Sequence, residues 1–275
     1  MTNQPILVLG ATGKTGARIA NRLEAKGLPV RRGSRNAVIP FDWNVPDTWG
    51  AVLGGVSAVY ISYYPDIAVP GAVETVTAFA DQARVAGVGK LVLLTGRGEY
   101  HAQRAEDVVR NSGVPFTIVR AAWFAQNFSE GALHAPVMAG VLPMPGGDVE
   151  EPIVDVDDIA DVAVAALTDP KHDGETYEVT GPHLMTFAQM AEALSAAIGR
   201  QVAHVPISFE DFHAALLPSQ GEMIADVLTE IARETLDGRN AKLADGVERV
   251  LGRPPRDFAT FATEAARSGA WADAA

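Results

Sequence analysis

The sequence contains no cysteine and no long hydrophobic run. Without cysteine the chain has no disulfide bond, no thiolate metal ligand and no cysteine nucleophile, a composition that fits a reducing compartment. The apolar run at residues 6–9 leads directly into glycine and is too short for a signal peptide. The run at residues 162–167 is far below membrane-spanning length. We therefore expect a soluble, cytoplasmic protein that has no membrane partner.

Positive charge is scarce as well. The 275 residues include 22 Lys and Arg against 34 Asp and Glu, which gives a formal net charge of −12. An acidic surface repels the phosphates of a nucleic acid, so we expect no nucleic-acid partner. Hydrophobic residues make up 48% of the chain, a proportion that is ordinary for a folded protein and argues against disorder.

What the chain does contain is an alternation of short apolar runs and amphipathic segments. The runs are rich in Val, Ile and Leu and are bounded by Gly or Pro. They lie at residues 6–9, 58–62, 91–95 and 116–119. Between them are segments of helical periodicity that end at Gly27, Gly87 and Gly113. This alternation predicts an α/β fold: a Rossmann-type doubly wound parallel sheet with helices on both faces.

The character of the sequence changes near residue 180. Before it, a helix opening at Asp157 and a strand near residues 176–179 continue the alternation, and residues 140–148 are expected to form a long loop. After it, helix follows helix, with a capping box at Thr186 and Gln189. We therefore predict a Rossmann domain at residues 1–180 and a smaller, mainly helical C-terminal domain at residues 181–275.

The heptapeptide GATGKTG at residues 10–16 carries two competing phosphate-binding patterns. Its Gly13-Lys14-Thr15 is similar to an ATP-binding P-loop, but a P-loop needs a glycine five positions earlier, where this chain has Val8 inside an apolar run. Glycines at 10, 13 and 16 between a strand and a helix instead indicate a dinucleotide-binding turn, whose helix N-terminus holds a pyrophosphate. The predicted loop consists of Gly10, Thr12, Gly13, Lys14, Thr15 and Gly16.

The residues at the end of the second strand indicate which dinucleotide this loop binds. NAD-specific folds place an acidic residue about 20 positions after the glycines, whereas an arginine there accepts the 2′-phosphate of NADP. This chain has Ser34 and Arg35, the latter 19 positions after Gly16, and no Asp or Glu between Lys26 and Ile39. A solvated basic turn is the alternative reading. We predict NADP(H) as the cofactor.

Seven segments carry a family likeness. In chain order they are GATGKTG (10–16), SR (34–35), FDW (41–43), TIVRAAWFAQNF (117–128), PIVDVDDIADVAVAALT (152–168), VTGPHLMTFAQMAEAL (179–194) and LGRPPRDFATFA (251–262). With them the sequence resembles the NmrA-like branch of atypical short-chain dehydrogenases/reductases over nearly its whole length. Within that branch it is similar to the festuclavine/agroclavine dehydrogenase type and its bacterial relatives, which implies a Rossmann fold and NADPH-dependent reduction of an iminium carbon.

The resemblance also implies roles for individual residues. It implies that Ser34 and Arg35 select NADP(H), and that Asp42 and Trp43 lie near the adenine. It further implies that Thr95 and Gly96 lie near the nicotinamide ribose. The residues implied to line the substrate cleft are Trp123, Phe124, Asn127 and Phe128. One departure is Ala121 after Arg120, where the family often has proline.

Tyr63 and Tyr64 follow the run at residues 58–62, where a sheet crevice would place them against a ligand. A role in core packing and a role in the ligand pocket fit these two tyrosines equally. Asp155, Asp157 and Asp158 form an acidic cluster, but they open a helix, where aspartates cap free N–H groups. The six histidines show no metal-ligand spacing, so we expect no metal.

The catalytic pair of ordinary short-chain dehydrogenases, Tyr-x-x-x-Lys, is missing. None of the five tyrosines has lysine four positions later, and the nearest imitation is Tyr100 with Arg104. Tyr100 is therefore only a weak catalytic candidate, and a loop tyrosine is the alternative.

Two functions remain open, and a sugar epimerase is a distant third, because the Tyr/Lys pair that its chemistry normally uses is missing. The first is an NADPH-dependent reductase that transfers hydride to a small, flat, unsaturated acceptor such as an iminium, a quinone or an activated carbonyl or alkene. Hydride transfer of this kind needs mainly orientation over the nicotinamide, so the missing pair does not exclude it. The second is a non-catalytic NADP(H)-binding redox sensor of the NmrA kind, which the absence of a recognisable acid or base favours. The sequence gives neither the substrate, nor the proton donor, nor the oligomeric state.

Overall fold

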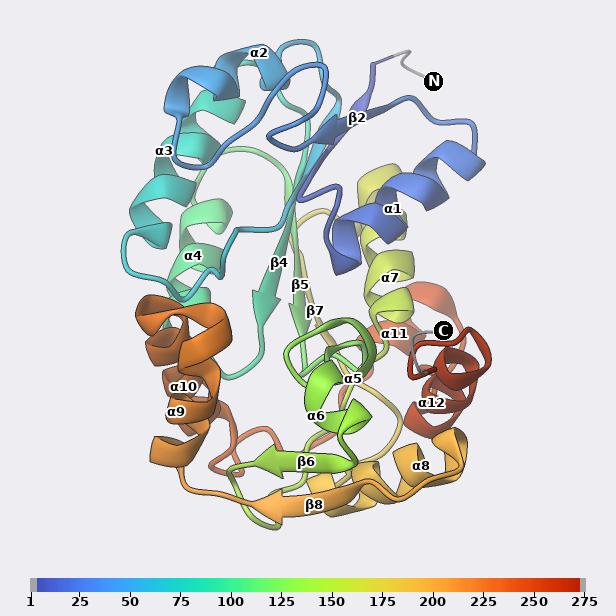
Figure 1. Ribbon diagram of the computed structural model, residues 1–275. Coiled ribbons are helices and arrows are strands. Elements are labelled where there is room, and N and C mark those ends of the chain that lie inside the picture. Colours follow the sequence, from blue (N-terminus) through green and yellow to red (C-terminus); the bar gives the residue numbers. More distant parts are fainter. Residues whose placement is uncertain (1–3, 273–275) are drawn as a thin grey trace.

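The computed structural model describes residues 4–272 and is built around a six-stranded parallel sheet (Figure 1). The strand order is β2-β1-β3-β4-β5-β7. The strands are β1 (Ile6–Leu9), β2 (Val30–Gly33), β3 (Ala58–Ile61), β4 (Leu91–Gly96), β5 (Phe116–Ala121) and β7 (Glu175–Val179). The order reverses between β1 and β3, which is the topological switch point of a doubly wound sheet. The predicted fold class and all four predicted apolar strands are confirmed.

Helices cover both faces of this sheet. The α-helices of the described residues, including those that lie elsewhere, are α1 (Lys14–Ala25), α2 (Trp49–Leu53), α3 (Ala72–Val85), α4 (Tyr100–Arg110), α5 (Asn127–Glu130), α6 (His134–Met138), α7 (Val156–Thr168), α8 (Phe187–Ile198), α9 (Phe209–Gln220), α10 (Glu222–Thr235), α11 (Gly246–Leu251) and α12 (Phe258–Arg267). One apolar core joins the sheet to α1, α7 and α11, and a second joins its other face to α2, α3 and α4. The two groups flank the sheet in Figure 1. None of the helices within residues 4–272 is long and apolar enough to cross a membrane.

Local sequence signals explain several helix ends. The side chain of Asp155 accepts a hydrogen bond from the backbone N–H of Asp157 and caps α7, as the aspartate cluster predicts. Thr186 and Gln189 form the predicted reciprocal capping box at the start of α8.

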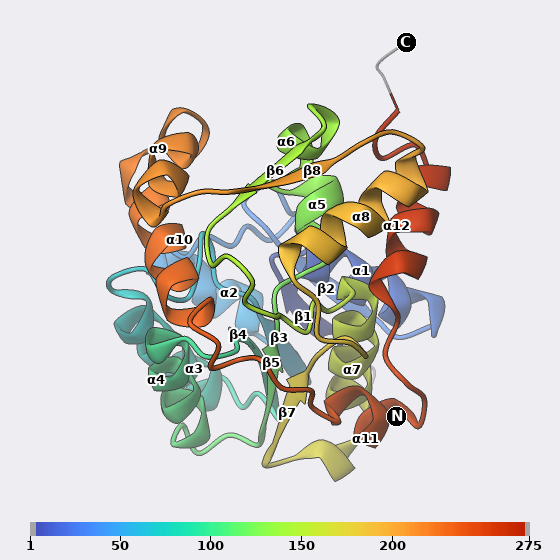
Figure 2. The ribbon, with the colours of Figure 1, turned by 90° about the horizontal axis from the view of Figure 1, so that it is seen from below.

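A third apolar core lies beyond the carboxyl ends of the strands. It unites residues between Ala125 and Ile153 with residues between Phe187 and Trp271. Within it, β6 (Val141–Met144) pairs in parallel with β8 (Ala203–Pro206) to form a second sheet. Figure 2 shows this ribbon running between α9–α10 on one side and α8–α12 on the other.

The expectation of a loop at residues 140–148 is therefore wrong in part, because β6 occupies four of those residues. The chain also passes more than once between the six-stranded sheet and the third apolar core, since α11 returns to pack on α7 and β7. A single boundary near residue 180 stays a prediction.

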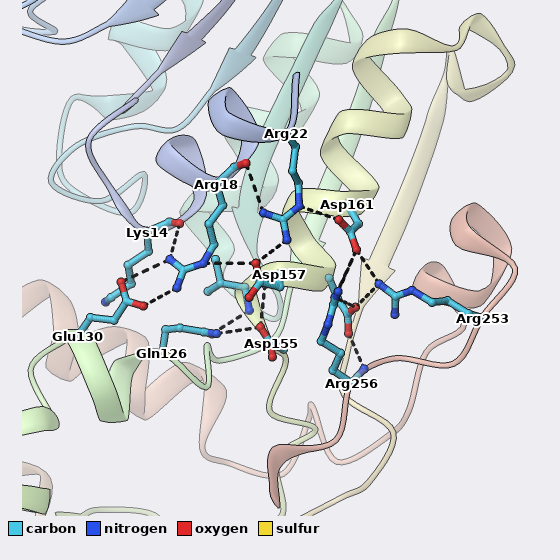
Figure 3. Close-up of polar contacts among 12 residues, drawn as sticks. Lys14, Arg18, Arg22, Gln126, Glu130, Asp155, Asp157, Asp161, Arg253 and Arg256 are labelled. Atoms are coloured by element: carbon cyan, nitrogen blue, oxygen red, sulfur yellow. Dashed lines mark hydrogen bonds and ion pairs between the residues drawn. The ribbon is translucent and has the colours of Figure 1, made fainter. Parts of the chain in front are cut away.

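Ion pairs fix α1 against α7 (Figure 3). Arg22 of α1 donates to Asp157 at 2.5 Å and to Asp161 at 2.7 Å, both on α7. Arg253 and Arg256, which follow α11, bind Asp161 and the buried Asp158 from the other side. Because Asp161 binds Arg22 of α1 and also Arg253 and Arg256, the network ties α1, α7 and the segment after α11 together.

Candidate functional site

The loop between β1 and α1 has the geometry of a phosphate cradle. Gly10 adopts a left-handed φ of +64°, and a Cβ on Gly16 would overlap the carbonyl oxygen of Gly10. Helix α1 starts at Lys14 after Gly13, with no side-chain cap and no acidic residue in its first turn. Its first N–H groups therefore remain open to an anion, and the positive end of the helix dipole favours one. These features fit a dinucleotide pyrophosphate.

Of the three arginines at residues 31–35, the two in β2 have partners within the protein, and the one in the turn after β2 is exposed. Arg31 donates to the backbone carbonyls of Val52 and Gly54, and Arg32 binds Glu24 and Asn21. Arg35 is exposed, with its guanidinium 5.7 Å from the centre of the Tyr64 ring, and it has no carboxylate partner within residues 4–272. Only Arg35 of the three is thus available for a ligand phosphate.

Ser34, Asp42 and Trp43 lie in the segment that follows this turn. The backbone carbonyl of Ser34 accepts the N–H of Phe41, which folds the segment back on itself. The backbone carbonyl of Asp42 accepts the indole N–H of Trp49 at 2.9 Å. Trp43 is nearly buried, and its ring lies 4.7 Å from that of Tyr63, centre to centre.

A cavity of about 340 Å³ opens at the carboxyl ends of β3, β4 and β5, beside the switch point. It brings together seven of the residues that sequence analysis singled out. They are Lys14, Tyr63, Thr95, Gly96, Trp123, Phe124 and Asn127. Leu228 and Ile231 of α10 close its far side. The phosphate loop and the aromatic segment therefore share one cavity, at the position where open α/β sheets bind their ligands.

Hydrogen bonds hold several of these side chains in place. The Lys14 ammonium donates to the side-chain oxygen of Asn127 at 2.9 Å, and its burial lowers the pKa of Lys14. The indole N–H of Trp123 donates to the Thr235 hydroxyl at 3.0 Å, which ties the aromatic segment to α10.

One residue predicted to line the cleft and the weak catalytic candidate lie outside the cavity lining. Phe128 does not line the cavity: it is 1% exposed and packs edge-on against Phe258 in the third apolar core. The expectation that it lines the cleft is corrected, because α5 turns this side chain away from the cavity. Tyr100, the first residue of α4, is 59% exposed and is also outside the lining.

Three charged residues that sequence reasoning missed do line the cavity: Asp66, Arg97 and Glu99. Burial raises the pKa of Asp66, although the backbone N–H of Ala68 opposes the shift. Burial also raises the pKa of Glu99 well above its ordinary value, and the charges of Asp66 and Glu234 add to the effect. No motif announces these acids, because they follow different strands and meet only in the folded chain.

Family models match most of the chain. The model of the NmrA-like family matches residues 101–253, and the model described as NAD(P)H-binding matches residues 10–170. The second match includes the phosphate loop and the basic turn. The expected nicotinamide dinucleotide cofactor is thereby confirmed. Within residues 4–272 no group of three or more His, Asp or Glu side chains has a metal-binding arrangement.

Known proteins are similar over almost their full length. An NAD(P)H azoreductase of Xenophilus azovorans is 34% identical and aligns over 94% of this chain and 96% of its own. An agroclavine dehydrogenase of Claviceps fusiformis is 30% identical, over 94% and 96%. The crystal structure of a Citrobacter sp. triphenylmethane reductase complexed with NADP(H) superposes with a TM-score of 0.78 at 23% identity, over 96% and 99%.

Proposed function

This chain belongs to the NmrA-like family and is an NAD(P)H-dependent oxidoreductase, and on that premise we propose that it reduces small, flat, unsaturated acceptors by hydride transfer from NADPH. One observation carries the proposal. Lys14 of the phosphate loop and the aromatic pair Trp123 and Phe124 line the same cavity. A cofactor bound at the loop and an acceptor held by the aromatic rings would therefore meet in one space.

The preference for NADPH over NADH rests on Arg35. It is exposed at the end of β2, where a 2′-phosphate would lie, and no carboxylate of residues 4–272 competes for it. Its neighbours Arg31 and Arg32 are occupied by partners within the protein. A guanidinium binds a phosphate in bidentate fashion, which gives both affinity and orientation.

The cofactor supplies the hydride, and the residues of the chain supply position. The N-terminus of α1 would bind the pyrophosphate, and Lys14, held by Asn127, would add a positive charge at the cavity wall. The rings of Tyr63, Trp123 and Phe124 offer flat apolar surfaces to an acceptor, and Leu228 and Ile231 exclude water from above.

The names of the relatives fit an acceptor of this class. An azo group and the central carbon of a triphenylmethane dye cation each belong to a conjugated system that accepts a hydride, and azo compounds and triphenylmethane dyes occur in the names of proteins similar to this chain. Which acceptor this chain takes is a matter for a substrate panel of cationic, azo and quinone compounds.

Two measurements test the proposal. Fluorescence titration of the purified protein should show tighter binding of NADPH than of NADH. Absorbance assays should then show NADPH oxidation with at least one planar acceptor, and Phe124→Ala should reduce kcat/KM for that acceptor while leaving NADPH affinity unchanged. NADPH binding without oxidation by any member of the panel would contradict the reductase function.

The same assay separates this function from a redox sensor. A sensor would bind NADP⁺ and NADPH but would not oxidise NADPH with any acceptor. The cavity favours the reductase, because a protein that only reports nucleotide state has no need for an aromatic acceptor site beside the cofactor.

A further inference from the structure

We propose that Glu99 is the proton donor of the reductase site, so that neutral acceptors such as quinones and azo compounds are reduced there. The proposal rests on the proposed function, because it assigns a role within that same cavity. A cationic acceptor becomes neutral on taking a hydride and needs no proton. A neutral acceptor gains negative charge instead, and a general acid lowers the barrier by neutralising it.

The position of Glu99 is unusual for a residue at the start of a helix. It occupies the N-cap position of α4, yet its side chain caps no N–H group. The backbone N–H of Tyr100 is instead bound by Glu234 of α10, at 3.1 Å. The Glu99 carboxyl group makes no hydrogen bond or ion pair within residues 4–272, and it lines the cavity. The usual structural reason for an acid at this position is therefore absent.

The end of β4 is shaped around this carboxyl group. A Cβ on Gly96 would overlap the Glu99 carboxyl group, so this group lies directly against the backbone at the end of β4. Thr95 and Gly96 lie at the carboxyl end of β4, on the side of the switch point opposite to Arg35. A dinucleotide that spans the crevice from Arg35 places its nicotinamide half on this side. The carboxyl group thus lies where hydride transfer would occur.

The surroundings of Glu99 favour its protonated form. Asp66 reaches the same cavity from the segment before α3, and Glu234 approaches from α10. Both carry like charge, and the partly buried site reduces the solvation of an ionised carboxylate. The cations that line this cavity are Arg97 and Lys14. Arg97 is engaged by Glu178 and by two backbone carbonyls, and Lys14 by Asn127, so both have partners other than Glu99.

The reaction balances with NADPH as the only reductant. The acceptor takes a hydride at one atom of its conjugated system, and the electron pair of the broken double bond moves to an oxygen or nitrogen at the other end. Glu99 gives that atom its proton and becomes a carboxylate, which water at the mouth of the cavity reprotonates. NADPH, one proton and a quinone thus yield NADP⁺ and a hydroquinone, and an azo compound yields the hydrazo compound.

The test compares two acceptors in one variant. With Glu99→Gln, kcat for a quinone should fall by at least about 30-fold. For a triarylmethyl cation, which needs no proton, kcat should change less than about 3-fold. In the wild type, kcat for the quinone should fall as the pH rises through the raised pKa of Glu99, and kcat for the cation should not. Glu74→Gln, at an exposed position in the first turn of α3, is the matched control and should leave both rates unchanged.

A second readout does not depend on turnover. An infrared spectrum of the wild type at neutral pH should contain a protonated-carboxyl band that Glu99→Gln removes and Glu74→Gln retains, with NADPH affinity equal in all three proteins. Loss of both activities together, no loss of either, or no such band would overturn the role of Glu99. Wild-type protein that binds NADPH and reduces neither acceptor would instead overturn the proposed function, and with it the need for a donor.

Discussion

The two ends of the cavity are built on opposite principles. At the cofactor end, binding is assigned to backbone N–H groups, to glycines that leave room for phosphate, and to the exposed cation Arg35. At the acceptor end it is assigned to large aromatic side chains, and the acids Asp66 and Glu99 line the cavity there. The cofactor end therefore depends on the shape of a short local segment, whereas the acceptor end depends on side chains that distant segments bring together.

The acids of the molecule differ in the same way. Beside α1, Asp157 and Asp161 pair with arginines, and the hydrogen bonds and charges of these arginines lower the pKa of Asp161 despite its partial burial (Figure 3). Near the acceptor end, Glu99 and Glu151 carry no hydrogen bond on their carboxyl oxygens within residues 4–272, and burial raises the pKa of both. Paired acids fix the scaffold, and unpaired acids weaken it and are available for chemistry.

The largest effect is expected from Gly16→Ala. The added Cβ would overlap the carbonyl oxygen of Gly10 and force the loop away from α1. NADPH affinity should fall by three orders of magnitude or more, on the order of 4 kcal/mol, in a fluorescence titration. Gly50→Ala is the control, because a Cβ at that position meets no atom within 4 Å. Normal binding by Gly16→Ala would show that the loop does not hold the pyrophosphate.

The next effect concerns stability and arises from Glu151, whose side chain is fully buried. Its pKa rises from 4.5 to about 8, chiefly through burial. Between these values the folded chain retains a proton that the unfolded chain has lost, so the free energy of unfolding falls as the pH rises from about 4.5 to 8. Glu151→Gln removes this loss and should stabilise the protein at pH 8 by on the order of 4 kcal/mol more than at pH 5. Urea unfolding at the two pH values measures it.

The matched variant is Asp158→Asn, which removes a buried carboxylate that pairs with Arg253 and Arg256 at 2.7 and 2.5 Å. It should destabilise the protein by roughly 3 kcal/mol, because it removes the buried carboxylate that binds both guanidinium groups and leaves them only Asp161 as a partner. If Glu151→Gln raised the free energy of unfolding at pH 8 and Asp158→Asn lowered it, the contrast between paired and unpaired acids would be sharpened. Equal destabilisation by both variants would contradict this contrast.

A smaller effect is expected from Arg35→Ala. It should weaken NADPH binding by about 30-fold, roughly 2 kcal/mol for the loss of a phosphate contact, and leave NADH binding unchanged. Arg32→Ala is the matched control, since Arg32 is already bound by Glu24. Parallel titrations with both nucleotides measure the ratio. If the ratio of NADPH to NADH affinity changed in Arg32→Ala and not in Arg35→Ala, the 2′-phosphate would be bound by Arg32 and the assignment to Arg35 would be wrong.

The difference between the two ends also explains what sequence could predict. The loop at residues 10–16 was readable because its glycines act within one βα turn, and Arg35 because its distance from them is short. The sheet of β6 and β8 was not, because Pro143 and Pro206 argue against strands and the pairing partner lies far along the chain. The prediction for Phe128 is wrong because the family likeness covers the whole segment at residues 117–128, whereas the side chain of Phe128, in α5, packs against Phe258 and not in the cavity.

Glu99 shows the limit most clearly. In the sequence Glu99 is an acid just before a helix, a position that predicts a side chain bound to the free N–H groups of that helix. Its actual surroundings come from Gly96, Asp66 and Glu234, on three different elements. Only the folded chain shows that the cap is supplied by Glu234 and that Glu99 faces the cavity.

The smallest effect is expected one residue further on, at Tyr100. Its side chain is exposed and outside the cavity, so Tyr100→Phe should change kcat with any accepted substrate by less than about 2-fold. Steady-state assays with a quinone and with a triarylmethyl cation measure this change and allow it to be compared with the change in kcat of Glu99→Gln. A fall confined to the quinone in Tyr100→Phe would give the proton to a phenol instead of a carboxyl group. The acceptor end would then donate a proton from a tyrosine, as an ordinary short-chain dehydrogenase does, and the unpaired carboxyl group of Glu99 would have no role in the contrast between the two ends of the cavity.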